Sequence, residues 1–405
     1  MLTRTAALCC LLIGCGASTS HSDNEVRIGL LLPYTGKDGS AGANYERGVL
    51  MAADQINAAG GLFHKPVRVI EADTHSSIER GISSAHSLID QGVVAIIGPE
   101  NDELARQLAP ILDAAGIALV TPSSSSVPDV KSATDSLWFR LAPSCNDLGN
   151  AIARQMTSKG ASKIAIVNTP AEYEVGFTAG VEKRLQLSGQ HSVASVVIGT
   201  DNSNFTDSIQ KISALQPDAI VLAADPSTAS RFVNQYAIVA GLSKIQWYLS
   251  PSLEQQGFVL NSFPEVVEGM IGVAPAVIDD ATQTRDFNQT FAARWEGATP
   301  TTGAYFYYDA MAVFGFAFEG AAVDSNSSSP ARDVLRDRVL TISGSGIYLS
   351  WKDIAKGISE SGEGSRVNYN GITGVFTFDS KTGARSAKYT RFWTITGGQF
   401  VRVAQ

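Results

Sequence analysis

The chain has 405 residues, of which 44% are hydrophobic and 17% charged, and its formal net charge is −8. This length exceeds what one hydrophobic core usually holds, and the composition is that of a folded protein, so we expect two lobes and exclude a disordered chain. The acidic balance, with no cluster of lysine and arginine, excludes nucleic acid as a partner, because binding to it depends on basic side chains that neutralise phosphates.

The N-terminus has the pattern of an export signal. Arg4 precedes an apolar run at residues 5–13, which is shorter than the roughly 20 residues needed to span a membrane. The run ends in LIGC, which resembles the bacterial lipobox, where the cysteine (here Cys15) is lipidated and becomes the new N-terminus. We therefore expect a signal peptide at 1–14, a lipidated tether at 15–24 and anchoring at the extracytoplasmic (periplasmic) face of the cell envelope.

Cysteine and histidine usage argues against other chemistry. Cys9 and Cys10 would leave with the signal peptide, so Cys145 cannot form a disulfide within the mature body. No histidine lies near Cys145 in the sequence, and we expect it to be inert and partly buried. The 5 histidines show no metal-ligand spacing, so neither a metal nor a cofactor is expected.

From residue 26 onward, short apolar runs alternate with amphipathic segments. The strands predicted in the first part of the chain are 26–32, 67–72, 93–97 and 117–121. The strands predicted in the second part are 163–167, 193–198, 219–223, 245–249 and 270–273. Strands that alternate with helices form parallel sheets covered on both faces, so the sequence predicts an α/β chain with two similar lobes.

Polar loops follow the third and fourth predicted strands. Asn101 and Asp102 follow the third, and Ser123, Ser124 and Ser125 follow the fourth. Their side chains and the free N–H groups of helix starts suit a small charged solute, and ligands of parallel sheets bind at the strands' carboxyl ends. The same residue types also cap helices and form turns, and the sequence alone leaves both roles open.

Motifs of common enzymes are missing from the sequence. Gly36, Gly39 and Gly42 have G-x-x-G-x-x-G spacing, which differs from the dinucleotide fingerprint. There is neither a phosphate-binding P-loop nor a G-x-S-x-G nucleophile elbow. We therefore expect a binding protein and not an enzyme.

Several short segments carry a resemblance to a known family. They are 57–61 (NAAGG), 93–99 (VVAIIGP), 139–144 (FRLAPS), 217–221 (PDAIV), 308–310 (YDA) and 371–379 (GITGVFTFD). Together, and in this order, they resemble the leucine/isoleucine/valine-binding family, the type I periplasmic substrate-binding proteins of ABC importers. The resemblance covers nearly the whole mature chain.

The resemblance implies two Rossmann-like lobes with parallel sheets, three hinge crossovers and a ligand cleft between the lobes. We place the crossovers near Pro143, Pro275 and Ile342. The expected division is 25–142 plus 276–342 for lobe 1 and 143–275 plus 343–405 for lobe 2.

The resemblance also implies a binding site. The ligand carboxylate would be held by the loops at Asp102 and Ser123–Ser125, and the ammonium would lie near Ser123, Ser125 and an acid at the position of Ser252. Tyr173 and Tyr305 match a ligand-touching tyrosine and an aromatic wall. Here Asp102 replaces the family's serine and Ser252 replaces the acid. Because an ionised Asp102 would repel a carboxylate, we expect simple branched-chain amino acids to bind weakly.

The sequence therefore predicts a monomeric, extracytoplasmic solute-binding lipoprotein of an ABC importer. It would close by a hinge motion around a small polar ligand, such as an amino acid, and dock on a membrane permease. The alternative is a ligand-sensing subunit for a membrane receptor or kinase, because its lobes would look the same.

Overall fold

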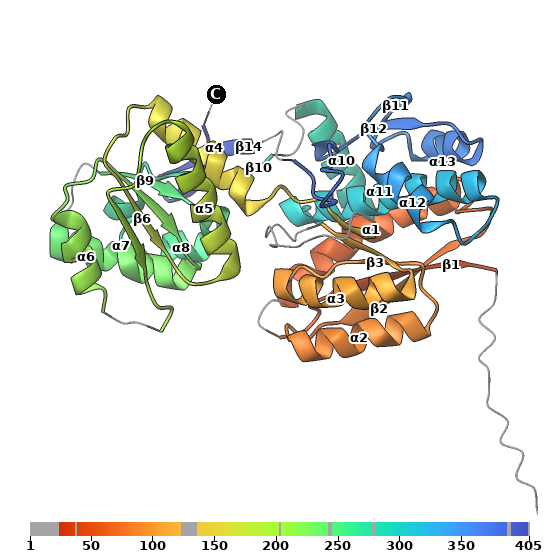
Figure 1. Ribbon diagram of the computed structural model, residues 1–405, viewed down its shortest axis with the longest axis horizontal. Helices are drawn as coiled ribbons and strands as arrows, with labels where there is room; N and C mark the ends of the chain where they lie inside the picture. The colour runs from red at the N-terminus through yellow and green to blue at the C-terminus, as the bar shows by residue number, and fades with distance from the viewer. Residues whose placement is uncertain are drawn as a thin grey trace, which may run out of the picture.

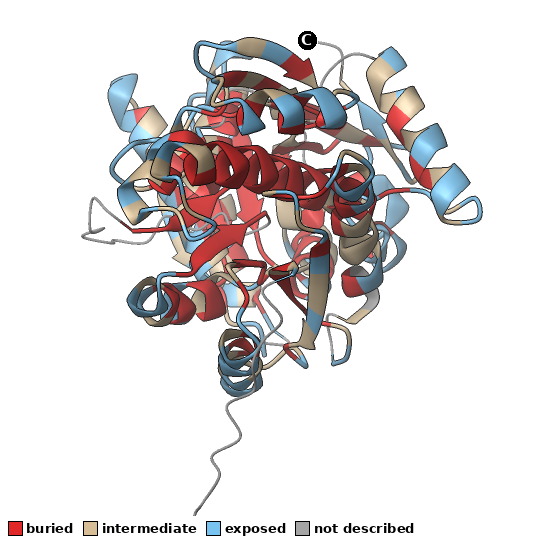
Figure 2. Ribbon diagram, turned by 90° about the vertical axis from the view of Figure 1, so that its right-hand side faces the viewer, coloured by how far each residue is buried: buried red, intermediate tan, exposed pale blue. Residues whose placement is uncertain are grey.

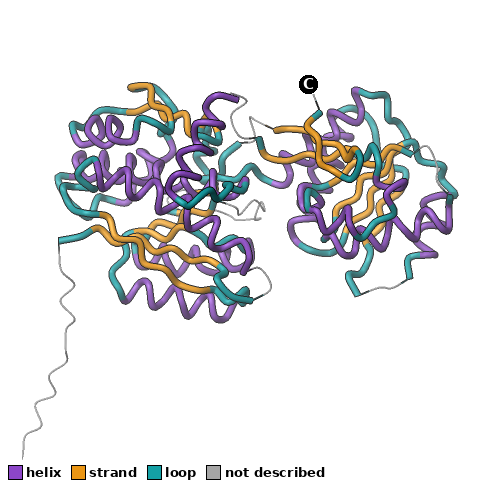
Figure 3. Tube along the Cα trace, turned by 180° about the vertical axis from the view of Figure 1, so that it is seen from behind, coloured by secondary structure: helices purple, strands orange, loops and turns teal. Residues whose placement is uncertain are grey.

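The computed structural model describes residues 24–36, 39–122, 136–201, 204–241, 245–276, 281–386 and 390–403. These residues form two lobes that lie side by side (Figure 1), each with strands flanked by helices (Figure 3). Cys15, with the predicted signal peptide and tether, lies outside the described residues, as do Ser123, Ser124 and Ser125. None of the described helices combines the length and the apolar character that a membrane span requires.

Lobe 1 is built on a parallel sheet of 5 strands in the order β2-β1-β3-β4-β5. The strands are β1 (Val26–Leu32), β2 (Val67–Asp73), β3 (Ala95–Ile97), β4 (Ala118–Thr121) and β5 (Trp138–Arg140). From Ile28 to Leu32, strand β1 carries only buried, non-polar residues because both sheet faces are covered there: Leu30 and Leu31 belong to different cores. The core of Leu30 includes α1 (Gly39–Ala58) and α11 (Thr302–Ser325), and that of Leu31 includes α2 (Ile78–Asp90) and α3 (Asp102–Ala115).

Helix α11 is the central element of lobe 1. Every residue from Ala304 to Ala322 is buried (Figure 2), as expected for a helix that is hydrophobic on all sides. Helix α1 packs against it with buried Val49 and Ile56. A Cβ atom at Gly48 would lie 2.3 Å from the carbonyl oxygen of Ala304, so glycine permits this close approach of the two helices.

A small 3-stranded sheet, β11-β12-β13, covers the other side of α11. Its strands are β11 (Ile347–Ser350), β12 (Val367–Gly371) and β13 (Gly374–Val375). Helices α10 (Ala281–Arg294), α12 (Arg332–Leu340) and α13 (Ile354–Gly362) complete lobe 1. The sequence did not predict this sheet, because a short apolar run does not reveal which strand it pairs with.

Asp309, which is fully buried in α11, joins that helix to the small sheet. Its carboxylate accepts hydrogen bonds from the hydroxyls of Tyr369 (2.7 Å) and Thr373 (2.6 Å). It also accepts from the backbone N–H groups of Ile372 (3.1 Å) and Thr373 (2.7 Å). Burial raises the pKa of Asp309, and the bonds from Thr373 and Tyr369 oppose the rise. These bonds satisfy a buried carboxylate that would otherwise be costly.

Lobe 2 contains a 7-stranded sheet in the order β15-β14-β10-β9-β8-β6-β7. The strands are β6 (Ile164–Asn168), β7 (Ala194–Val197), β8 (Ala219–Ala223), β9 (Gln246–Leu249), β10 (Ile271–Pro275), β14 (Thr390–Thr396) and β15 (Gln399–Arg402). Strands β6 to β10 are parallel, and β14 is antiparallel to both β10 and β15. A Cβ atom at Gly272 would lie 2.0 Å from the Trp393 ring, so β10 needs glycine beneath the indole.

Helices cover both faces of the lobe 2 sheet. On one face α4 (Cys145–Ser158) and α5 (Glu172–Leu187) pack on Ile164 and Ile166. On the other, α6 (Thr206–Ser213), α7 (Pro226–Ala240), α8 (Gln256–Leu260) and α9 (Pro264–Val267) pack on Ala165 and Val167. The predicted fold class, two lobes with parallel sheets, is confirmed.

The chain passes between the lobes at three places. The first lies between β5, which ends at Arg140, and α4, which begins at Cys145, and the second follows β10, which ends at Pro275. The third does not lie near Ile342, because the segment 343–386 packs into lobe 1 through buried residues such as Leu349 and Tyr369. Ser386 still bonds to lobe 1, through Thr377, and the next described residue, Thr390, begins β14 of the lobe 2 sheet.

Candidate functional site

The carboxyl ends of β6 and β9 bring two polar elements together at the edge of lobe 2. Helix α5 begins shortly after β6, and the 3-10 helix η1 (Pro251–Leu253) follows β9. Glu174, in the first turn of α5, is only 4% exposed. Its Oε1 accepts a hydrogen bond of 2.6 Å from the hydroxyl of Ser252 on η1.

The second carboxylate oxygen of Glu174, Oε2, is buried and has no hydrogen-bond partner among the described residues. The hydroxyl oxygen of the fully buried Ser250 is in the same situation. Burial raises the pKa of Glu174, and the hydrogen bond from Ser252 and the nearby hydroxyl of Ser250 oppose the rise. Asp225 adds a nearby negative charge that raises the pKa further.

Helix η1 also forms part of a pocket of about 440 Å³ between the two lobes. Lobe 1 contributes Asn44, Tyr45, Thr301, Thr302 and Gly303, and lobe 2 contributes Pro251, Glu254, Gln255, Ala274, Pro275 and Arg391. Ser252 lies between two of these lining residues in the sequence and is half-buried. The Glu254 carboxylate and the Arg391 guanidinium form a bidentate ion pair at 2.6 and 2.7 Å. This pocket and the adjoining polar edge of lobe 2 form the candidate site.

On lobe 1, Asn101 and Asp102 lie at the start of α3. The side chain of Asn101 caps the helix, since its Oδ1 accepts a 2.9 Å bond from the backbone N–H of Leu104. Asn101 also lines a pocket of about 160 Å³ at the carboxyl ends of β2 and β3. Asp102 is half-buried near Arg140: burial lowers the pKa of Arg140 to about 10, and Asp102 opposes that change. The charge of Asp102 is therefore partly balanced by a cation of its own lobe.

The two predicted tyrosines differ in their surroundings. Tyr173 is half-buried, packs on the lobe 2 core and directly precedes Glu174. Tyr305 is 8% exposed, its ring lies 5.1 Å from that of Phe287, and its hydroxyl donates to Asn288 at 2.7 Å. Burial raises the pKa of Tyr305. The structure thus places Tyr173 at the start of α5, next to Glu174 in the sequence and packed on the lobe 2 core, and Tyr305 in the core of lobe 1.

The sequence analysis missed Glu174. An acid in the first turn of a helix is usually solvated and favoured there by the helix dipole, so the position of Glu174 did not indicate that its carboxylate is buried. The spacing of apolar residues could have indicated it. Phe177 and Val181, three and seven residues after Glu174, are buried on the same helix face. A carboxylate on the apolar face of a helix needs a partner or a function.

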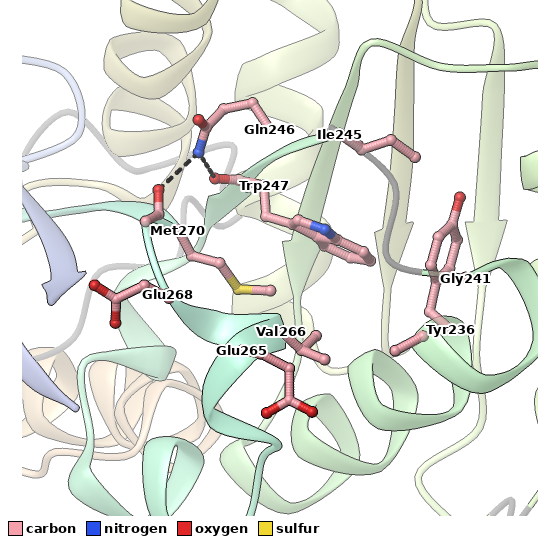
Figure 4. A pocket seen from close by; sticks show the side chains of 11 residues that line it. Tyr236, Gly241, Ile245, Gln246, Trp247, Glu265, Val266, Glu268 and Met270 are labelled. Carbon is pink, nitrogen blue, oxygen red and sulfur yellow. Dashed lines mark hydrogen bonds between the residues drawn. The ribbon is translucent and has the colours of Figure 1, made fainter. Parts of the chain in front are cut away.

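A third pocket, of about 190 Å³, lies at the other end of the lobe 2 sheet, where β9 begins and α7 ends (Figure 4). The Gln246 side chain donates to the carbonyls of Trp247 (3.2 Å) and Gly269 (3.0 Å). Figure 4 shows the carboxylates of Glu265 and Glu268 pointing away from the Trp247 indole. Because parallel sheets bind ligands at the carboxyl ends of their strands, the pocket between the lobes is the better candidate. Within the described part of the chain, no group of acidic, histidine or cysteine side chains is arranged to hold a metal ion.

Comparison with known proteins agrees with this architecture. Residues 25–347 match the family described as periplasmic binding protein. An amino acid binding protein of Pseudomonas aeruginosa is 24% identical over 341 residues, which cover 81% of this chain and 87% of that protein. A Leu/Ile/Val-binding protein of Rhizobium johnstonii is 25% identical over 205 residues, which cover 50% of this chain and 55% of that protein.

Among solved structures, an ABC transporter substrate-binding protein from Desulfitobacterium hafniense in complex with Leu has a TM-score of 0.71 and 20% identity. The alignment covers 94% of this chain and 100% of that one. Two lobes built on mainly parallel sheets, with a pocket lined from both, are the architecture of a two-lobed binding protein. The chain belongs to the periplasmic binding protein family, whose members are extracytoplasmic binding proteins and not enzymes, and the resemblance to Leu/Ile/Val-binding proteins is confirmed.

Proposed function

We propose that this chain is the solute-binding protein of an ABC importer and traps a small polar ligand, an amino acid or a related compound, between its lobes. The observation that carries the proposal is the pocket of about 440 Å³ lined from both lobes, beside the polar pair of Ser252 and Glu174. The names of the relatives, which include an amino acid binding protein, support an amino acid as the ligand.

The connection between the lobes suits hinge closure. Three passages of the chain join them, and the Arg106–Glu172 ion pair that also links them is at the surface. An exposed ion pair contributes about 0–1 kcal/mol, so it does not lock the lobes together. A ligand that contacts both lobes binds the closed form more tightly and shifts the equilibrium toward it. The closed form would then dock on the membrane permease.

The test is a thermal-shift screen of purified protein without residues 1–23, against amino acids, small carboxylates and short peptides. A ligand at 100 times its dissociation constant stabilises the folded state by about 2.7 kcal/mol, which a melting assay detects. Small-angle scattering should then show a smaller radius of gyration with that ligand than without it. A screen in which no compound raises the melting temperature, or a radius that ligand leaves unchanged, would contradict the proposal.

Membrane attachment through Cys15 is the remaining part of the proposal. It is supported by the LIGC sequence that ends the N-terminal apolar run. Mass spectrometry of the mature N-terminus from the native host should find a lipid-modified Cys15. An unmodified N-terminus at another residue would remove the anchor and leave the solute-binding proposal intact.

A further inference from the structure

We infer that Glu174 fixes the direction of the Ser252 hydroxyl, so that the lobe 2 wall of the cleft accepts a hydrogen bond from a cationic N–H group of the ligand. Glu174 is then a positioning residue that acts through Ser252 and makes the site selective for protonated amines. The inference rests on the proposed function, because it requires a ligand between the lobes.

The first step is the hydrogen bond itself. A serine hydroxyl has one proton and two acceptor lone pairs. In the 2.6 Å bond the proton of Ser252 is directed to Oε1 of Glu174. The lone pairs that remain can only accept. A ligand group that meets this hydroxyl must therefore be a donor, and another acceptor, such as a carboxylate, would find no proton there.

The second step is the arrangement of the pair relative to the cleft. Ser252 is half-buried, whereas Glu174 behind it is 4% exposed. Pro251 and Glu254, on either side of Ser252 in the sequence, line the pocket between the lobes. Glu172, two residues before Glu174, pairs across the lobes with Arg106 at 3.2 Å. The serine is thus the member that a ligand meets, and the carboxylate is the charge behind it.

The third step is the incomplete pairing of the carboxylate. Buried carboxylates in proteins usually have several hydrogen-bond donors, because an unpaired one is costly. Asp309 in lobe 1 accepts four such bonds, whereas Glu174 accepts one, from Ser252, with the Ser250 hydroxyl nearby, and its Oε2 has no partner within hydrogen-bond distance among the described residues. Asp225 places further negative charge nearby. A ligand cation at Ser252 would balance the negative charge of Glu174 and Asp225. A purely structural role of Glu174 would not require a cation there.

The test compares ligands that differ only in the amine. The probes are three pairs: L-leucine and 4-methylpentanoate, L-phenylalanine and 3-phenylpropanoate, and L-alanine and propanoate. Dissociation constants from calorimetry give the ratio of amine to amine-free affinity for each pair. The unaltered protein should prefer the amine in the pair that binds best, by about tenfold or more, as expected for a charge-assisted hydrogen bond.

Glu174→Gln should abolish this preference, because the amide can donate to Ser252 and free its proton to point at the ligand. Glu174→Asp should restore part of it, and Ser252→Ala should lose it. Asp207→Asn, which removes an exposed acid from the first turn of α6 in the same lobe, should leave the ratio unchanged. The ratio is informative even if the variants melt at lower temperature, since lost stability alone weakens both members of a pair.

The possible outcomes distinguish a failure of the inference about Glu174 from a failure of the proposed solute-binding function. Equal affinity for amine and amine-free probes in the unaltered protein, or a ratio unchanged in Glu174→Gln, overturns the inference while the solute-binding proposal stands. If none of the six probes binds, the proposed amino-acid ligand is wrong and the inference falls with it.

Discussion

Arg106 of lobe 1 and Glu172 of lobe 2 form an ion pair between the two lobes, with 3.2 Å between Nη1 and Oε1. Both side chains are substantially exposed, at 42% and 38%. The pair therefore links elements that the proposed hinge closure would move relative to each other, but it does so weakly, because solvent and salt screen exposed charges.

Loss of this pair should have only a small effect on folding and on ligand binding. For Glu172→Gln we expect a change in the free energy of unfolding below about 1 kcal/mol. The ligand affinity should change by no more than about fivefold, which is the same energy expressed as a binding ratio. Urea unfolding and calorimetry measure the two quantities. A loss of several kcal/mol in unfolding would show that the pair holds the fold together.

The hydrogen bonds to Asp309, in contrast to the Arg106–Glu172 ion pair, should contribute strongly to stability. Asp309→Ala leaves several buried donors without a partner, so we expect a loss of about 3 kcal/mol or more in the free energy of unfolding. Asp337→Ala is the matched control, since its partner Arg366 and Asp337 itself are 44% and 55% exposed, and it should cost less than about 1 kcal/mol. Urea denaturation of both variants checks the contrast, and similar losses would contradict it.

Glu46 on α1 predicts a pH dependence of stability. Burial and a hydrogen bond with Glu71 raise the pKa of Glu46 from 4.5 to about 7. Between about pH 4.5 and pH 7, the folded protein therefore keeps a proton on Glu46 that the unfolded chain has released. The stabilisation is complete below about pH 4.5 and is lost as the pH rises toward 7.

The melting temperature should therefore fall from pH 5 to pH 8 more steeply in the unaltered protein than in Glu46→Gln, which cannot titrate. Glu265→Gln, at an exposed position, should keep the slope of the unaltered protein. Parallel slopes for Glu46→Gln and the unaltered protein would show that the Glu46 carboxyl does not hold the proton.

Asp102 remains a prediction about ligand charge. If its carboxylate faces the ligand, a carboxylate about 4 Å away would be disfavoured by about 4 kcal/mol at an effective dielectric of 20, and nearby Arg140 reduces that figure. We expect Asp102→Ser to tighten the binding of leucine or valine about tenfold. Calorimetry with both amino acids checks this, and strong binding by the unaltered protein with no gain in the variant would exclude it.

The two tyrosines give a paired prediction. Tyr305→Ala should lower the free energy of unfolding by about 3–5 kcal/mol, because the ring is buried in the lobe 1 core. Tyr173→Ala should weaken ligand binding with a smaller loss of stability, because Tyr173 is half-buried and directly precedes Glu174 at the start of α5. Thermal melting with and without ligand separates the effects, and the reverse pattern would place the ligand contact on Tyr305.

Much of the fold could be predicted because buried strands and amphipathic helices have distinct periodicities. The predicted strands at 26–32 and 219–223 coincide with β1 and β8. The lobe to which 343–386 belongs could not be predicted, because strand pairing depends on contacts distant in sequence. In the site, resemblance indicated Ser252 but not the carboxylate behind it. That carboxylate comes from another element, α5, and only the packing of α5 against η1 brings Glu174 to Ser252.

The position of β14 has a consequence for synthesis of the protein. Strand β14 is the neighbour of β10 in the sheet, and its Trp393 lies over Gly272, yet it is made more than 100 residues later. While the ribosome makes lobe 1's second half, β10 is an unpaired sheet edge, and such edges invite association with other chains. A chain that ended before residue 390 would leave this edge open to other chains, whereas the finished chain covers the edge with its own β14.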